Sequence, residues 1–303
     1  MITPEQREER RHCVGASDVA ALLNCDPWRS AADVWTSKVY ETEDSPSAHM
    51  TLGSRLEPMV LAWAEERLGP LERDPEKLHF PSLIADVPLA ANLDAYVKED
   101  GTPVEAKTSG VLGPIFGQWG EEGTDNVPDH IILQCQAQLI CTGRDLCHQP
   151  ALLGGRGFVM YEIPRNVALI AIICDEIRAF WKLVRDRTPP PDSVPHLEVL
   201  KRIRRQPKKV VGIEPELIED YLHAKLLADE AAETKDMAQA KLIAALGDAE
   251  LGDGGQAGKF WYRRESAGMR VDNDKLQAQY PDVYQEVAFA ATRMMPRYSA
   301  YKP

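Results

Sequence analysis

The stretch LAANLDAYVKEDGTPVEAKT, residues 89–108, contains two short runs separated by an acidic turn. Apolar and polar residues alternate over residues 89–97, and Asp100-Gly101 is a strong signal for a hairpin turn. We therefore predict two antiparallel strands joined by residues 98–102. Because side chains alternate along a strand, Glu105 and Lys107 should point the same way. Asp94 should lie close to Glu105 across the hairpin.

The chemistry of this pattern indicates a metal site. Two carboxylates placed together repel each other, which favours a compensating cation, and carboxylate oxygens are ligands that Mg²⁺ prefers. A lysine beside them can orient a metal-bound water for phosphodiester hydrolysis or stabilise charge. A Glu-x-Lys triplet alone is also compatible with a plain surface ion pair, so the triplet does not decide between the two interpretations.

Composition narrows the function classes. The 303 residues include 35 basic and 47 acidic ones, a net charge of −12 that argues against non-specific binding to nucleic acid without excluding a local basic groove. The six cysteines include no CxxC pair or zinc-site spacing and are predicted to be free thiols. No apolar run is long enough to span a bilayer, and the N-terminus lacks a signal peptide's apolar core. We expect a cytoplasmic protein without membrane contact.

Hydrophobic periodicity and punctuation predict three parts: a mixed α/β domain over residues 1–190, a proline-rich basic linker over 191–212, and a helical C-terminal extension over 213–303. Ser17 or Asp18 is a candidate N-cap of a short early helix. The elements expected are helices at 54–68, at 128–142, in the later half of 167–186 and at 215–246, a strand at 157–164, a hairpin at 253–266 and a helical piece at 270–287.

Glu57 has two interpretations. It shares a helical face with Val60, Leu61 and Ala64, and a buried carboxylate is costly unless it is paired or binds a metal. Ser54-x-x-Glu57 also fits a capping box, in which the glutamate side chain accepts from the N-cap amide. The pattern alone does not decide between an active-site acid and a cap.

Four segments in order resemble one family. They are RRHCVGASDVAALLNCDPW at 10–28, GSRLEPMV at 53–60, the Asp…Glu-x-Lys hairpin, and IILQCQAQLICTG at 131–143. This series resembles the YqaJ-like viral recombinase family, which includes phage lambda exonuclease, within the PD-(D/E)xK nuclease superfamily. The resemblance implies a restriction-endonuclease-like α/β core, with a central mixed sheet flanked by helices, over about residues 7–190, followed by a mainly helical extension.

The resemblance also implies roles for individual residues. The catalytic set would be Glu57, Asp94, Glu105, Lys107 and Gln134. The metal ligands would be Asp94, Glu105, the backbone carbonyl of Ala106, and Glu57. Arg10 and Ser17 would hold a DNA 5′-phosphate, with Arg11 as the competitor for Arg10, and Gln136 would be a second contact. Periodicity does not choose among Gln134, Gln136 and Gln138, and amides satisfied within a buried helix are the alternative. The expected cofactor is Mg²⁺, with Mn²⁺ as a substitute and no iron–sulfur cluster.

The implied function is a phage-type exonuclease that resects linear double-stranded DNA from 5′ to 3′ for recombination by single-strand annealing. Its partners would be DNA ends, an annealing recombinase and further copies of itself in a trimeric ring, in a bacterial cytosol. The alternatives are an endonuclease or repair nuclease with the same core, and a non-catalytic DNA-binding protein. The basic cluster at residues 201–209 could follow a DNA backbone or be a solvated arm.

Overall fold

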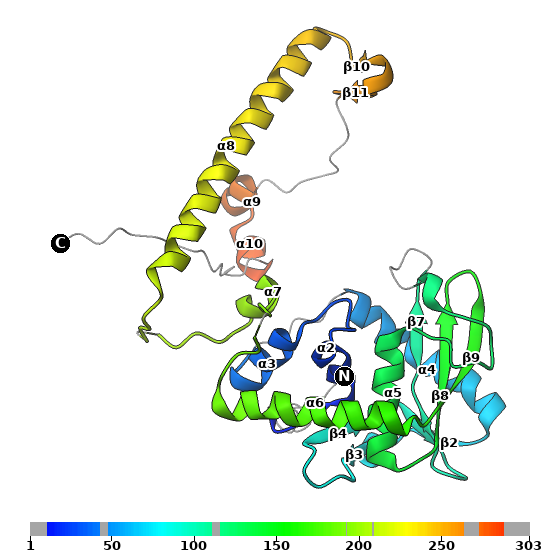
Figure 1. Ribbon diagram of the computed structural model, residues 1–303. Helices are drawn as coiled ribbons and strands as arrows, with labels where there is room; N and C mark the ends of the chain where they lie inside the picture. The colour runs from blue at the N-terminus through cyan, green and yellow to red at the C-terminus, as the bar shows by residue number, and fades with distance from the viewer. Residues whose placement is uncertain are drawn as a thin grey trace. The chain divides into compact units, whose positions relative to one another are not determined.

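The computed structural model describes residues 11–42, 48–110, 116–191, 193–207, 209–263 and 273–287. The chain forms two compact units, residues 1–205 and 206–303. Figure 1 shows the elements of both units. Arg10 lies outside the described residues.

Unit 1 contains two sheets. The smaller one has the order β1-β4-β3, with β1 at Val14–Gly15, β3 at His79–Pro81 and β4 at Leu89–Asn92. The larger one has the order β2-β5-β6-β8-β7, and β9 pairs with β8. Its strands are β2 at Leu71–Glu72, β5 at Ala95–Val97, β6 at Pro103–Val104, β7 at Lys107–Ser109, β8 at Leu146–Leu153 and β9 at Gly157–Pro164. Parallel β6–β8 and β7–β8 pairs stand beside antiparallel ones, so the sheet is mixed, as predicted.

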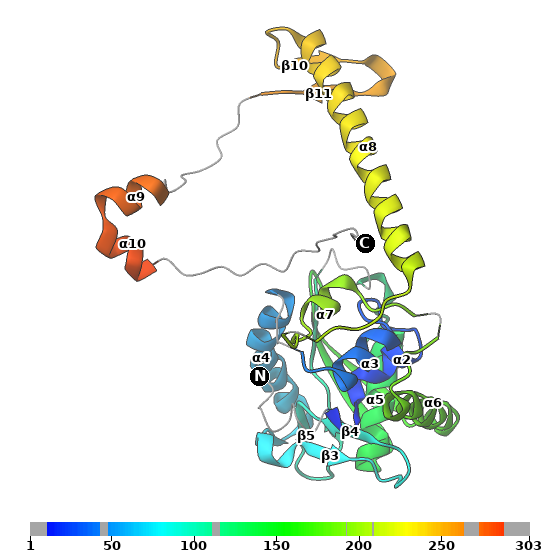
Figure 2. The same cartoon turned by 90° about the vertical axis from the view of Figure 1, so that its left-hand side faces the viewer.

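The helices of unit 1 are α2 at Val19–Leu22, α3 at Ala31–Val39, α4 at Ala48–Leu68, α5 at Asp129–Thr142, α6 at Val167–Asp186 and α7 at Leu197–Lys201. Short 3₁₀ turns occupy Ala16–Asp18, Pro75–Lys77 and Phe116–Gln118. Figure 2 shows α2 and α3 beside α5 and α6. The helix predicted in the later half of residues 167–186 was placed too late, since α6 begins at Val167, where the Asn166 side chain accepts from the amide of Leu169 at 3.0 Å.

Helix α5 explains the arrangement of the core. One set of its side chains, including Ile131, Cys135 and Leu139, packs with apolar residues of β8 and β9. Another set, including Leu133 and Ala137, packs with α2, α6 and β4. The helix is thus covered on two sides, which is why it is apolar nearly all round, as predicted. A third cluster places α4 against alternate residues of β5, β6 and β9, so α4 and α5 cover opposite faces of the larger sheet.

Three sequence predictions need correction. The fourth helix begins at Ala48, so Ser54 lies within α4 and is not its N-cap; Pro58 is accommodated inside this helix. Of the two candidate N-caps of the short early helix, Asp18 holds the position and Ser17 does not: Ser17 lies in the preceding 3₁₀ turn, across which the Asp18 carboxylate accepts from the Gly15 amide at 3.1 Å. The run at 89–97 is two strands in different sheets, β4 and β5, with the break at Leu93 and Asp94.

The predicted linker begins on unit 1. Residues 193–205 pack on α3 and its flanks: the Ala32 amide donates to Ser193 Oγ at 3.3 Å, and the buried Asp33 carboxylate accepts from the backbone and ring of His196. Leu197, Val199 and Leu200 form one turn of helix in α7, which the proline content of the segment had obscured. The boundary between the units falls at residue 205.

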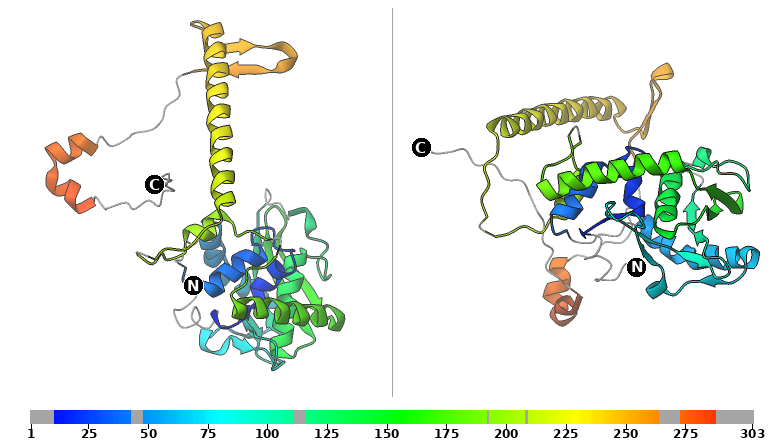
Figure 3. Two further views of the ribbon diagram at one scale, coloured as in Figure 1. Left: turned by 60° about the vertical axis from the view of Figure 1, so that its left-hand side comes forward. Right: turned by 60° about the horizontal axis from the view of Figure 1, so that its bottom comes forward.

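Unit 2 contains the predicted long helix, α8 at Pro215–Leu246, with the bounds expected from Pro215 and Gly247. The hairpin of β10 at Leu251–Asp253 and β11 at Lys259–Trp261 follows it, and Figure 3 shows the hairpin after the C-terminal end of α8. A 3₁₀ turn at Gly255–Ala257 lies between the two strands, and α9 at Asn273–Gln279 and α10 at Pro281–Val287 complete the described residues of this unit.

Candidate active site

The β5–β6 hairpin brings the two predicted acids together. Ala95 pairs with Val104 and Tyr96 with Pro103, so Asp94 and Glu105 are the next pair in the same register. Asp94 Oδ2 accepts the backbone N–H of Ala106 at 2.9 Å. This bond fixes one carboxylate oxygen at the break between β4 and β5.

Glu105 is held by three side-chain donors. The residue is buried, at 2% exposure. Oε1 accepts from Lys107 Nζ at 2.6 Å and from Gln134 Nε2 at 2.5 Å, and Oε2 accepts from Gln138 Nε2. Lys107 Nζ also donates to Gln134 Oε1 at 2.9 Å. A carboxylate with this many donors has a fixed orientation, so the Glu105–Lys107 pair is more than a surface ion pair.

The three glutamines of α5 are now distinguished. Gln134 and Gln138, four residues apart, lie on one helix face and reach Glu105. Gln136 lies on another face, where its amide donates to the Pro164 carbonyl at 2.7 Å and accepts from the Asn166 amide at 2.8 Å. Both ends of its buried amide thus bind backbone groups, and its contact with DNA stays a prediction. Gln138 is the site residue that the sequence did not single out.

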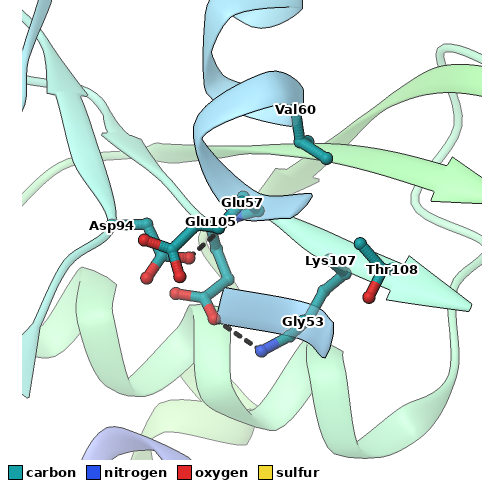
Figure 4. A pocket seen from close by; sticks show the side chains of 8 residues that line it. Gly53, Glu57, Val60, Asp94, Glu105, Lys107 and Thr108 are labelled. Atoms are coloured by element: carbon teal, nitrogen blue, oxygen red, sulfur yellow. Dashed lines mark hydrogen bonds and ion pairs between the residues drawn. The ribbon is translucent and has the colours of Figure 1, made fainter. Parts of the chain in front are cut away.

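Glu57 lies within α4 and faces the acids. With Gly53, Asp94, Glu105 and Lys107 it lines a cavity of about 220 Å³. Figure 4 shows Glu57 on the helix above the Asp94 and Glu105 carboxylates, with Lys107 beside them. Since the helix begins before Ser54, the capping-box interpretation of Glu57 is wrong.

The electrostatics of the cavity favour a cation. Burial and the nearby Glu105 carboxylate raise the pKa of Asp94 well above its ordinary value. Burial and Glu105 also raise the pKa of Glu57. Burial alone would lower the pKa of Lys107, but the Glu105 and Asp94 carboxylates raise it above its usual range. Three crowded acids share one ammonium, and a divalent cation would relieve the remaining repulsion.

The donor set fits a hard cation with retained waters. Among the residues the structure describes, no three acidic, His or Cys side chains already meet as a coordination cluster. Mg²⁺ usually takes one or two carboxylates and keeps several waters. The three acids and the backbone carbonyl on this cavity offer enough oxygen ligands for such a site. The residues that would hold it are Asp94, Glu105, Ala106 through its carbonyl, and Glu57.

A second cavity of about 240 Å³ adjoins the first and shares Lys107 and Thr108 with it. Ser17 and Gln134 also line it. Ser17 thus lines the same cavity as Lys107 and Gln134, although it is not a helix cap. Arg11 is half-buried, and its role as competitor of Arg10 stays a prediction.

A mixed sheet between helices, carrying an Asp…Glu-x-Lys hairpin opposite a helical glutamine, defines a protein of the PD-(D/E)xK class. Residues 7–145 match the family model of the YqaJ-like viral recombinase domain. This match confirms the resemblance seen in the sequence over that part of the chain.

Individual proteins that are similar to this chain match between 61% and 92% of it. The chain is similar to the uncharacterized protein YqaJ of Bacillus subtilis (strain 168), with 27% identity over 292 residues, which cover 92% of this chain and 88% of the relative. The solved alkaline exonuclease LHK-Exo of Laribacter hongkongensis is similar at 24% identity and a TM-score of 0.48, covering 66% of this chain and 97% of its own. A structure of LHK-Exo with dAMP gives 22% identity and a TM-score of 0.48, covering 61% of this chain and 94% of its own.

In the described ranges no helix has the length and apolarity to cross a membrane.

Proposed function

We propose that this chain is a Mg²⁺-dependent DNA exonuclease that degrades one strand of linear double-stranded DNA from the 5′ end. The observation that carries the proposal is the convergence of Asp94, Glu105, Lys107 and Gln134 beside one cavity. The viral recombinase domain supports DNA as the substrate. A 3′-tailed product would suit a single-strand annealing partner, and assembly into a ring is part of the same proposal.

The residues of the site would have different roles in hydrolysis. When bound, Mg²⁺ supplies a coordinated water of lowered pKa and positive charge beside the phosphate. Asp94 and Glu105 would hold the cation, and Gln134 and Gln138 fix the rotamer of Glu105. Within the described chain, two of the three Lys107 N–H groups have acceptors, so the third remains for the attacking water or a phosphate oxygen.

Cleavage of the P–O3′ bond would leave a hydroxyl on the released nucleotide and a 5′-phosphate on the shortened strand. Each round would thus recreate the end that Ser17 and Arg10 are proposed to hold. An enzyme of this kind should prefer a 5′-phosphate to a 5′-hydroxyl, and Arg10→Ala should reduce that preference.

The test uses linear duplex labelled at the 5′ or the 3′ end of one strand, beside covalently closed circular duplex. We expect immediate release of the 5′ label as a mononucleotide in Mg²⁺, retention of the 3′ label in long products, and no cleavage of the circle. Asp94→Asn and Glu105→Gln should remove cleavage while DNA binding persists. Equal cleavage of the circle would indicate an endonuclease, and near-normal activity of either variant would contradict the assigned site.

A further inference from the structure

The second cavity differs in character from the acidic one. The acidic cavity is lined mainly by polar residues, whereas the second has aromatic walls from Trp28, Trp119 and His130 beside the cationic side chains of Arg29 and Lys107. At about 240 Å³ it lies below the ~300 Å³ at which drug-sized pockets begin, so it suits one small unit. Aromatic surface next to positive charge suits a base joined to a phosphate.

Trp28 is exposed but held in place. Its residue exposure is 56%. The Asp26 carboxylate accepts the backbone N–H of Trp28 at 2.9 Å and that of Arg29 at 3.1 Å, which fixes the loop. The indole meets the His130 ring edge-on, with centroids 5.3 Å apart and an interplanar angle of 89°. Since the ring is already oriented, a planar ligand could stack on it with little further loss of conformational entropy.

The aromatic pair is tied to the catalytic helix. His130 lies in the first turn of α5, four residues before Gln134, which donates to Glu105. Burial and the nearby Lys107 ammonium lower the pKa of His130, which favours the neutral form of the ring that contacts Trp28.

The charged side of the cavity has its own support. Arg29 donates through Nη1 to Asp18 at 2.9 Å and through Nε to Asp26 at 3.0 Å, and Nη2 donates to the Ser17 carbonyl. These bonds fix the guanidinium next to Ser17. One part of the cavity wall thus has the cations of Arg29 and Lys107 and the Ser17 hydroxyl, with the Asp26 carboxylate paired to Arg29, and another part has flat rings.

We propose that this cavity binds the terminal nucleotide of the degraded strand, with its base stacked on Trp28 and its phosphate toward Ser17, Arg29 and Lys107. The inference rests on the proposed function and narrows it, because the enzyme would bind the base of the nucleotide that it removes as well as the phosphate. The free mononucleotide product would occupy the same place and compete with the next DNA end.

The first test measures binding of dAMP and of deoxyribose 5-phosphate, which lacks the base, to the full chain by calorimetry. Stacking of one base on an aromatic ring corresponds to roughly a 5- to 150-fold gain in affinity. We expect dAMP to bind more tightly by a factor in this range and Trp28→Ala to bring the two dissociation constants together. Trp261→Ala, which removes an equally exposed tryptophan of unit 2 at 56%, should leave the ratio unchanged.

The second test uses single-turnover cleavage of duplexes whose 5′-phosphorylated terminal residue is either deoxyadenosine or an abasic analogue. Loss of the base should slow the wild type, and Trp28→Ala should cut both substrates at the slower rate. If Trp28→Ala retains the full preference for dAMP and for the intact base, the base site is wrong although the exonuclease proposal stands. If no substrate is degraded but the Trp28-dependent preference for dAMP persists, the exonuclease proposal fails and the nucleotide site remains.

Discussion

Replacing Gln138 by leucine tests whether Glu105 depends on its buried amide donor for metal binding. Gln138 is fully buried, donates to Glu105 Oε2 and accepts from the Cys147 thiol at 3.5 Å. Leucine has a similar volume and lacks both functions, so Gln138→Leu removes one of the three donors that orient Glu105.

The size of the expected loss of metal affinity follows from the donors that Glu105 keeps in the variant. Lys107 and Gln134 both bind Oε1, so without Gln138 the other oxygen of Glu105 loses its protein donor among the described residues and the carboxylate can rotate. Loss of an outer partner of a metal ligand typically lowers metal affinity by about 10- to 100-fold, or ~1.4–2.7 kcal/mol. The free energy of unfolding should also fall, by ~1–3 kcal/mol, because a buried hydrogen bond is lost.

The assay is calorimetric titration of Mn²⁺ and Ca²⁺ into the wild type and the variant, with thermal unfolding measured on the same samples. Gln136→Leu is the matched control: it is on the same helix, equally buried, and its amide also makes two hydrogen bonds, but to Pro164 and Asn166. It should lose stability and keep metal affinity. If both variants bind Mn²⁺ like the wild type, or if both lose affinity equally, Gln138 does not position Glu105.

Three further predictions follow from other parts of unit 1. Lys107→Ala should lower the single-turnover rate by ~100-fold or more because a positioned charge is lost, and Lys107→Arg should not restore the rate. Cleavage by Lys107→Ala at the wild-type rate would refute the catalytic role of Lys107. Several hydrogen bonds lower the pKa of the buried Asp33 carboxyl despite its desolvation. The stability that Asp33 contributes is therefore present above its ordinary pKa of 3.8 and is lost as pH falls through its folded-state value, so denaturation curves of wild type and Asp33→Asn should differ at neutral pH and converge in acid. Gly101 has φ +75° and a Cβ there would lie 2.7 Å from Arg144 Nη2, so Gly101→Val should destabilise by ~1–3 kcal/mol while Gly212→Val changes little.

Local patterns predicted the elements whose determinants lie within a few residues. Helix α8 has the predicted bounds because proline and glycine punctuate it directly. The alternation from Leu89 to Val97 survives in the burial of these residues although the run is divided between two sheets. Asp94, Glu105 and Lys107 meet because a short hairpin fixes their relation almost by itself.

Features that depend on tertiary packing could not be predicted from the sequence. Helix α5 is covered on two sides, so its pattern has no polar face that could rank Gln134, Gln136 and Gln138; only the position of Glu105 does this. The strand β8 contains Pro150, His148 and Gln149 and does not look like a central strand, yet it pairs with β6, β7 and β9. The start of α4 was misplaced because a capping signal at Ser54 occurs inside a longer helix.

The β5–β6 hairpin has a consequence for how the length of this chain can change. Residues 95–97 and 103–104 are paired, and insertion of one residue there would turn Asp94 or Glu105 to the other face of the sheet. An insertion between the exposed residues Glu99 and Asp100 would lengthen the turn, which lies on the far side of the paired residues from the acids. We therefore expect the protein to accept a peptide tag in the turn. A single alanine inserted among the paired residues, about three positions away, should disrupt the active site.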